Sequence, residues 1–206
     1  RVFVNGERVA SVADDPRLAP GIAAVGVTYD FALDERYRHL MTAEYRANGK
    51  TVNRMLHIDE EPQDLLSKLE ATRLVCRESG CAQRYLTHDG VNAIHQATHQ
   101  IDDATSSDYH QRFLAYLDQV HADDITLGIA MTDGKGDRSL RPSDQPNPDS
   151  YVHIKTRRKD GIVIRGAKAI ITGAPYMHEL LVMPCRNMTE DDADFGISLA
   201  QTGTAV

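Results

Sequence analysis

The sequence predicts an α+β fold in which helices come first and β-strands follow. Up to about residue 125, apolar residues recur at helical spacing, whereas the later stretch "SYVHIKTRRKDGIVIRGAKAIITGAP" alternates apolar and polar positions. A single change of period favours helical and antiparallel β layers that are segregated from each other. We therefore expect a mostly helical domain over residues 1–125, led by a β-hairpin, and an antiparallel β-domain over residues 126–206.

The first expected elements are a hairpin and a helical segment. The hairpin is indicated by "RVFVNGERVA", in which Asn5-Gly6 is a two-residue turn signal between apolar runs. Residues 14–49 then show helical spacing, with Pro16 and Pro20 as start signals and Asn48-Gly49 as a stop signal. We expect helix across this segment.

Three further helices are expected before residue 125. Residues 59–79 carry acids and Pro62 at their start, which suits a helix N-terminus, and Gly80 marks a kink or an end. Residues 81–101 and 108–124 supply the other two helices. In the first of the three, an approximate core-facing stripe consists of Leu65, Leu66, Leu69, Leu74 and Val75.

Strands are expected after the change of period. Lys159-Asp160-Gly161 separates two alternating runs, and Asp-Gly is a turn pair whose twist matches that of the flanking strands. This pattern predicts a β-hairpin. The segments "ELLVMPCRN" and "DFGISLAQ" indicate further sheet.

Charge and composition exclude several classes of protein. The chain has 23 Lys and Arg against 30 Asp and Glu, a net charge of −7, with both signs interspersed. We therefore expect neither a nucleic-acid partner nor an anionic-membrane patch. We find no long apolar run and no signal-peptide pattern, so we expect no membrane segment and a cytoplasmic location.

The cysteines and the chain ends add two expectations. Cys76, Cys81 and Cys185 cannot all pair, and we expect them to be thiols or ligands. The chain begins inside a hairpin strand and stops after a strand and a turn. We therefore expect it to be a fragment of a longer protein.

The densest loop joins the two halves and reads "AMTDGKGDRSLRPSDQPNPDS". Its two glycines let backbone amides approach a ligand closely, and Lys135, Arg138 and Arg141 add positive charge. This combination suits a phosphate or pyrophosphate, although it matches neither a Walker loop nor a Rossmann turn. A solvated interdomain loop rich in turn formers is the alternative.

Two pairs of side chains have spacings that matter for metal binding. Cys81 and Tyr85 lie four apart and would share a helix face, whereas Cys76 and Cys81 would point about 140° apart. One thiol and one phenol do not complete a cluster site, and Cys81 alone also suits a small buried side chain. His95 and His99 are four apart as well, but no carboxylate-containing metal motif surrounds them.

Four stretches together closely resemble one flavin-dependent family. They are "LMTAEYRANGKTVNRML", "AMTDGKGDRSLRP", "TRRKDGIVIRGAKAIITGA" and "HELLVMP". The family contains 4-hydroxybutyryl-CoA dehydratase and the oxygenase component of 4-hydroxyphenylacetate 3-monooxygenase. The resemblance implies a cytoplasmic homotetramer with an acyl-CoA dehydrogenase-like fold: an N-terminal helical domain, a middle β-domain, and a C-terminal helical bundle that would be missing here.

The resemblance also implies an FAD site. The loop from Met131 to Arg138 and the strand end from Ile170 to Thr172 match segments that contact FAD in the family. Thr172 would lie near the flavin ring, where a hydroxyl can tune the reactive nitrogen. The dehydratase has a His at the position of Ile170. The expected cofactor-binding residues are Met131, Thr132, Asp133, Lys135, Gly136, Asp137, Arg138, Ile170, Ile171 and Thr172.

The same resemblance bears on an iron–sulfur cluster. The dehydratase holds one through two cysteines four apart, of which Cys81 matches the first and Tyr85 replaces the second. The monooxygenases instead carry an Arg and a Tyr there, both contacting a phenolic substrate, and a His where this chain has Ile129. Because a phenolate is a poor substitute for a thiolate in such a cluster, we expect no cluster and no metal, with Cys81 a ligand only if a cluster is present.

Three functions follow from the resemblance. The first is a monooxygenase that hydroxylates a phenolic ring with FADH2 from a separate reductase, with Tyr85 as the catalytic contact to the substrate. The second is a CoA-thioester dehydratase or isomerase, for which Gln83 lies near the substrate and a remnant or altered cluster is bound through Cys81. Across these readings the expected substrate-binding residues are Tyr85, Gln83 and Cys81. The third is a non-catalytic flavin-binding protein, which the apolar Ile129 and Ile170 motivate. We expect a homo-oligomer with a small-molecule substrate.

Overall fold

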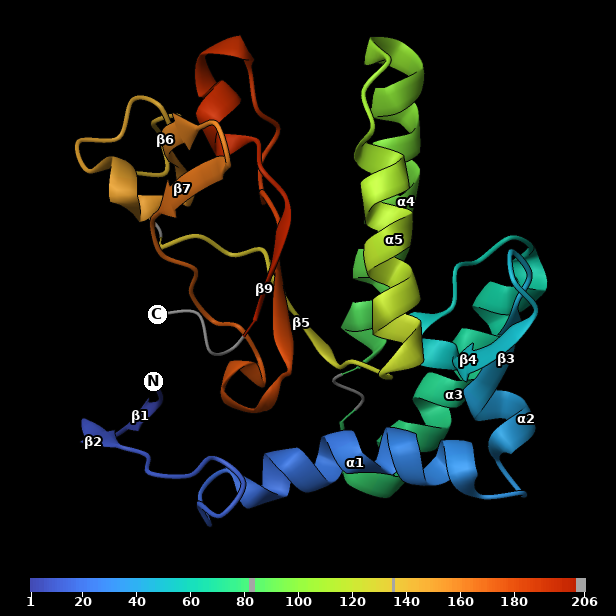
Figure 1. The fold of residues 1–206 in the computed structure, drawn as a ribbon. Coiled ribbons are helices and arrows are strands. Elements are labelled where there is room, and N and C mark those ends of the chain that lie inside the picture. The colour runs from blue at the N-terminus through green and yellow to red at the C-terminus, as the bar shows by residue number, and fades with distance from the viewer. Residues whose placement is uncertain (82–83, 135, 203–206) are drawn as a thin grey trace. The chain divides into compact units, whose positions relative to one another are not determined.

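The computed structural model describes residues 1–81, 84–134 and 136–202. Contacts within the chain divide it into two units. We call residues 1–127 with 175–178 the helical unit, and residues 128–174 with 179–202 the sheet unit. All five α-helices of the described residues lie before β5, two short hairpins lie among them, and the strands β5–β9 follow, which confirms the expected α+β class (Figure 1).

The helical unit contains the five α-helices and two hairpins. Its elements are β1 (Phe3–Val4), β2 (Glu7–Arg8), α1 (Ala19–Leu33), α2 (Arg38–Met41), β3 (Thr42–Tyr45), β4 (Lys50–Asn53), η1 (Arg54–Leu56), α3 (Pro62–Ser79), α4 (Tyr85–Thr105) and α5 (Tyr109–Ala122). The remaining elements are β5 (Leu127–Ala130), η2 (Pro148–Ser150), β6 (His153–Arg158), β7 (Gly161–Arg165), η3 (Ala174–Tyr176), β8 (Glu179–Val182), η4 (Glu190–Phe195) and β9 (Leu199–Thr202).

The N-terminal hairpin forms as its turn signal predicts. Phe3 pairs with Arg8 and Val4 with Glu7, and both Asn5 and Gly6 have positive φ, as a tight primed turn requires. The second hairpin was not expected. β3 and β4 pair from Thr42 with Asn53 to Tyr45 with Lys50, so the helical prediction for residues 42–49 is wrong.

The reason for that error is local. Asn48-Gly49 marks the end of a helix or the turn of a hairpin equally well. In this chain Gly49 has φ +69° and its amide donates to the Tyr45 carbonyl at 2.8 Å, which closes the turn between the strands. The residues on either side are rich in Thr, Tyr and Val, which favour strands.

Helix α3 begins and ends where the sequence indicates, but it buries a different face. Pro62 is its first residue, and Gly80 caps its end with φ +70°. The side chains turned to the protein interior are those of Asp64, Lys68, Ala71 and Val75. Three of the leucines expected in the core are exposed instead: Leu65 at 48%, Leu66 at 53% and Leu69 at 43%.

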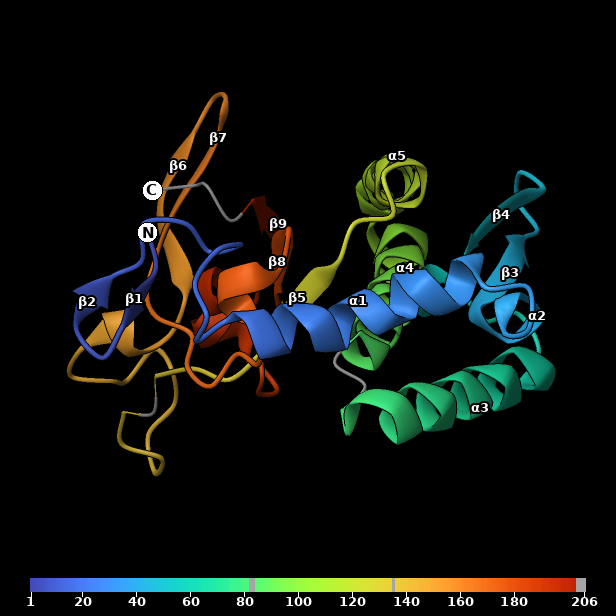
Figure 2. The same cartoon turned by 90° about the horizontal axis from the view of Figure 1, so that it is seen from below.

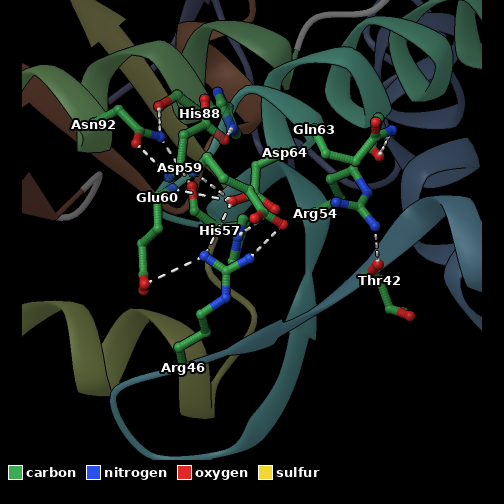
Figure 3. A network of polar contacts seen from close by, with 12 residues as sticks. Thr42, Arg46, Arg54, His57, Asp59, Glu60, Gln63, Asp64, His88 and Asn92 are labelled. Atoms are coloured by element: carbon green, nitrogen blue, oxygen red, sulfur yellow. Dashed lines mark hydrogen bonds and ion pairs between the residues drawn. The ribbon is translucent and has the colours of Figure 1, made fainter.

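Paired charges explain this reversal. Asp64 Oδ2 accepts hydrogen bonds from the amides of Glu60 at 3.0 Å and Glu61 at 3.2 Å, which caps the helix start. The guanidinium of Arg46 closes the same network through Glu60 and Glu61 (Figure 3). Because the Asp64 carboxylate accepts two backbone hydrogen bonds and lies near the Arg46 guanidinium, this polar residue can face the interior of the unit.

Helices α4 and α5 run side by side as a helical hairpin (Figures 1 and 2). Ser106 ends α4 with φ +55°, and the carboxylate of Asp102 accepts from the amides of Tyr109 and His110 at the start of α5. α4 begins at Tyr85, so the expectation that Cys81 lies inside this helix is wrong. The left-handed Gly80 stops α3, and the chain is not helical at Cys81.

The core of the helical unit lies between α1, α2, α3 and η1. It is formed by Met41, Met55, Ala71 and Val75, against which Phe31 and other side chains of α1 and α2 pack. These apolar contacts fix α3 against α1 and α2.

The sheet unit holds a three-stranded sheet in the order β5-β8-β9 and the separate hairpin β6-β7. β8 and β9 are antiparallel. The amides of His178 and Met183 donate to the carbonyls of Thr126 and Ala130, so β5 and β8 run in the same direction, and the expectation of an entirely antiparallel sheet is wrong for this pair. In the hairpin, Arg158 pairs with Gly161.

The β6-β7 hairpin therefore has Lys159 and Asp160 as its loop residues, with Gly161 at φ +153° opening the second strand. The hairpin itself is confirmed, one residue away from the expected Asp-Gly turn. Within the described ranges, no helix is both long and apolar enough to cross a bilayer.

Candidate functional site

A loop after β5 forms the main candidate site of the sheet unit. It begins at Met131, and the segment that ends at Thr172 runs beside it: the amide of Ala169 donates to the Thr132 carbonyl at 2.8 Å, and Asp133 forms an antiparallel bridge with Lys168. The two segments that the sequence assigns to a cofactor thus meet within one unit.

The carboxylate of Asp133 is buried at this junction and 4% exposed. Its Oδ1 accepts from Lys168 Nζ at 2.6 Å, and its Oδ2 accepts from Cys185 Sγ at 3.1 Å. Burial and the neighbouring carboxylate raise the pKa of the Cys185 thiol. The Asp133 carboxylate is therefore bonded to other residues of the protein, and it contributes to a ligand site by fixing the loop.

The glycines of the loop serve its own closure. The Gly134 amide donates to the Ser150 carbonyl at 2.9 Å. A Cβ on Gly136 would lie 2.0 Å from Gln145 Oε1, and that same oxygen accepts from the Asp137 amide at 2.9 Å. The glycines are thus needed because Gln145 and Ser150 pack closely against the backbone.

The positive charges expected in this loop have different partners. Arg138 is exposed and has no hydrogen bond or ion pair to the described residues, so its guanidinium is available to a ligand. Arg141 is instead paired with the fully buried Asp192 through Nε at 2.8 Å and also donates to the Asn187 carbonyl. Lys135 lies outside the described residues.

Ile170 has an unusual backbone. It is a β-branched residue with φ +58° and 77% of its surface is exposed. Such a conformation costs free energy and persists only where the surroundings impose it, commonly at functional sites. The turn continues with the Ala174 amide donating to the Ile171 carbonyl at 3.2 Å, and it leaves Thr172 exposed.

Tyr85, the expected substrate contact, opens α4 in the helical unit and is 37% exposed. The ammonium of Lys68 lies 5.7 Å from the centre of its ring and donates to Asp89 Oδ1 at 2.6 Å. Lys68 is buried, whereas half of the Asp89 side chain is exposed. The Lys68 ammonium lies against the face of the Tyr85 ring, so the Tyr85 hydroxyl can still form a hydrogen bond with a substrate.

Arg84 directly precedes Tyr85 and anchors the start of α4. Its side chain is fully buried, and it donates to Asp124 Oδ1 at 2.7 Å and to Thr28 Oγ1 at 3.2 Å. The guanidinium also stacks 4.4 Å from the centre of the Tyr29 ring. Sequence reasoning did not single out Arg84, because a lone arginine before a helix gives no sign that it is buried.

The structure gives less support to the other residues that are expected beside a substrate. Cys81 is partly buried, and its carbonyl accepts from Ser79 Oγ at 2.5 Å. Because α4 starts only at Tyr85, Cys81 and Tyr85 do not share a helix face. Gln83 lies outside the described residues. Cys76, Cys81 and Cys185 are all free thiols.

The helical unit also has a buried His–Asp pair beside an open groove, neither of which the sequence indicated. His88 Nε2 lies 3.0 Å from Asp59 Oδ1 (Figure 3), and burial lowers the pKa of His88 although Asp59 opposes that shift. The groove has a volume of about 540 Å³, and Asp59, His95 and His99 help to line it. In the described part of the chain, no three His, Cys, Asp or Glu side chains are arranged to hold a metal ion.

The amino-acid sequence is similar to proteins with two different activities. Over 201 residues the chain is 40% identical to the 4-hydroxybutyryl-CoA dehydratase/vinylacetyl-CoA-Delta-isomerase of Clostridium aminobutyricum, which covers 97% of this chain and 41% of that protein. It is 26% identical over 204 residues to the oxygenase component of 4-hydroxyphenylacetate 3-monooxygenase from Thermus thermophilus, covering 97% of this chain and 40% of that protein.

Solved structures agree with both similarities. An oxygen-tolerant archaeal 4-hydroxybutyryl-CoA dehydratase from N. maritimus superposes with a TM-score of 0.94 at 38% identity, covering 98% of this chain and 40% of that chain. The oxygenase component of 4-hydroxyphenylacetate 3-monooxygenase complexed with FAD superposes with a TM-score of 0.80 at 23% identity, covering 97% and 41%, and shows the same fold. The chain thus spans about two fifths of the length of these relatives.

These likenesses confirm the expected fold, that of the N-terminal region of acyl-CoA dehydrogenase-like flavoproteins of this kind. Residues 1–202 match the family model described as 4-hydroxyphenylacetate 3-hydroxylase N terminal. The chain therefore belongs to the 4-hydroxyphenylacetate 3-hydroxylase family.

Proposed function

We propose that the complete protein is an FAD-dependent enzyme and that the sheet unit carries part of its FAD site. The proposal is carried by one observation: apolar, hydroxyl and cationic side chains are exposed together on the loop after β5 and on the segment that is hydrogen-bonded to it. Met131 is 43% and Ile170 77% exposed, and Arg138 and Thr172 are exposed as well. A flavin ring needs apolar contacts and a hydrogen-bonding group beside it, and a pyrophosphate needs a cation.

Each of these residues has a distinct role in the proposal. Arg138 binds phosphate, because a guanidinium presents several donors in a fixed plane. Met131 and Ile170 contact the flavin ring, and the Thr172 hydroxyl bonds one of its heteroatoms. When bound, FAD supplies the redox chemistry of the reaction. Of the other expected residues that the structure describes, Thr132, Asp133, Gly136 and Asp137 shape the loop, and Ile171 shapes the turn after Ile170.

We further propose a CoA thioester as the first candidate substrate. The similarity to the dehydratases, 40% in sequence and a TM-score of 0.94 in structure, exceeds the similarity to the monooxygenase. Tyr85 is the observation that favours the second candidate, hydroxylation of a phenol with reduced flavin, since an exposed phenol at the start of α4 can bond a phenolic substrate.

The complete protein, purified without oxygen, tests these proposals. Its iron, acid-labile sulfide, flavin and visible spectrum should be measured together, and it should then be supplied with 4-hydroxyacyl-CoA and 3-enoyl-CoA thioesters. Turnover of either thioester supports the first candidate. Oxygen uptake with a phenol and a flavin reductase, without thioester turnover, supports the second. A protein that binds no flavin contradicts both.

The role of Arg138 has its own test. Arg138→Ala should raise the Kd for FAD by roughly tenfold or more, because a charge-assisted hydrogen bond contributes about 1.5 kcal/mol or more. Arg158→Ala is the matched control, since Arg158 is an exposed arginine of the same unit, on β6. Equal FAD affinity in the two variants would remove Arg138 from the site.

Assembly as a homotetramer and supply of reduced flavin by a separate reductase belong to the proposal for the complete protein. Light scattering coupled to size-exclusion chromatography measures the first. Dependence of oxygen uptake on added reductase measures the second.

A further inference from the structure

We propose that Lys168 is a positioning residue for the flavin site and that its ammonium locks together the two segments which contact the cofactor. This inference rests on the proposed function, because it places FAD against residues 131–134, residues 136–138 and Ile170–Thr172. Nothing in the sequence distinguishes Lys168 from the other lysines, and its role emerges only from its contacts.

The ammonium of Lys168 uses all three of its donors inside the sheet unit. Nζ donates to the Met131 carbonyl at 2.8 Å, to Asp133 Oδ1 at 2.6 Å and to the Met183 carbonyl at 2.9 Å. The Lys168 side chain is 10% exposed and the Asp133 side chain 5%. One nitrogen therefore joins the end of β5, the end of β8 and the segment that leads to Ile170.

A buried ion pair is a poor way to stabilise a fold, since apolar side chains of similar volume often do so equally well. What a fully bonded ammonium provides is a fixed geometry. The carbonyl of Met131 and the carboxylate of Asp133 come from the start of the expected cofactor loop, so Lys168 determines where this loop begins.

The strained turn at Ile170 lies two residues further along the chain. On one side of it, Lys168 and the Ala169 amide are bonded to the β5 end, and on the other side the Ala174 amide is bonded to the Ile171 carbonyl. A positive φ at a β-branched residue persists only when its flanks are held. The contacts of Lys168 fix the flank that precedes Ile170, and they thereby fix the positions of Ile170 and Thr172.

Three diverging donors at one point are a property of lysine. An arginine would present a planar fork that cannot reach the same three acceptors. Lys168→Arg therefore keeps the charge and alters the geometry, whereas Lys168→Met keeps the approximate volume and removes the charge. Lys155→Met is the matched control, because Lys155 is an exposed lysine on β6 with no hydrogen bond or ion pair to the described residues.

The test is FAD binding by the complete protein, together with the visible circular dichroism of the bound flavin and the Tm of the apoprotein. Lys168→Met and Lys168→Arg should each raise the Kd for FAD by roughly tenfold or more, the equivalent of one lost charge-assisted hydrogen bond. Both should also change the visible dichroism, which reports the flavin environment, while Lys155→Met resembles the wild type. If Lys168→Met fails to fold, Lys168→Arg decides.

Two results overturn the inference in different ways. If the wild type binds FAD and the Lys168 variants bind it with the same Kd and the same dichroism, with only the Tm lowered, Lys168 is structural and the proposed function stands. If the wild type binds no FAD, the proposed function and this inference fail together.

Discussion

The buried pair of Arg84 and Asp124 predicts an asymmetric response to mutation. Arg84 is fully buried, whereas the Asp124 side chain is 37% exposed. Asp124→Asn leaves a guanidinium inside the protein without a counter-charge, which costs about 3 to 5 kcal/mol. Asparagine also tolerates the left-handed backbone of Asp124, with φ +44°, so the backbone is not strained by the change. The change removes the charge and one of the two acceptors, which bond Arg84 and Asn53.

Arg84→Met should cost less, about 1 to 2 kcal/mol. It leaves an Asp124 carboxylate that water can reach. Besides the ion pair, the variant loses the hydrogen bonds to Thr28 and to the Ile125 carbonyl and the stacking on Tyr29, and the apolar methionine partly offsets these losses. Removing the buried partner is therefore expected to be the milder change, which is the reverse of what burial alone suggests.

Urea unfolding measures both effects. Far-ultraviolet circular dichroism follows the helical unit, and tyrosine near-ultraviolet dichroism provides a second probe because this region has no Trp. Asp123→Asn, an exposed neighbour, is the control and should change the unfolding free energy by less than about 0.5 kcal/mol. A larger loss of stability in Arg84→Met than in Asp124→Asn would contradict this asymmetry, and so would an unchanged urea midpoint in both variants.

Three further predictions concern single residues. Ile170→Gly should stabilise the apoprotein by about 1 kcal/mol by relieving the positive φ, as measured by urea unfolding, and a destabilised variant would contradict the strain. Tyr85→Phe should weaken substrate binding by about 1 kcal/mol and leave the Kd for FAD unchanged, and unaltered kinetics would reject the contact. Burial raises the pKa of Asp192, but hydrogen bonds from Arg141 and backbone amides outweigh it and hold that pKa well below its ordinary value. Asp192 therefore contributes stability above pH about 4 that is lost as the pH falls. Asp192→Asn should have a lower free energy of unfolding than the wild type at pH 7, and this difference should become smaller below pH 4. A difference that does not change with pH would contradict this.

Elements whose signals are local could be predicted from the amino-acid sequence. Asn5-Gly6 forms a primed turn, Pro62 begins α3 and Gly80 ends it, because the backbone preferences of these residues act within a few positions. The loop after β5 could likewise be proposed as a phosphate site from its residues, whereas the segment ending at Thr172 was assigned to a cofactor only through the family resemblance. Asn48-Gly49 shows the limit, since the same local signal fits a helix end and a hairpin turn.

Only the tertiary structure decided which polar residues are buried and what they hold. Lys68 pairs with Asp89 over 21 positions, Lys168 with Asp133 over 35, and Arg84 with Asp124 over 40. A charge becomes a stable interior group when its partner is present, and the partner lies too far along the chain for periodicity to reveal. For that reason leucines lie outside on α3 and lysine inside, and for that reason Lys168 rather than a loop glycine sets the geometry of the proposed flavin site.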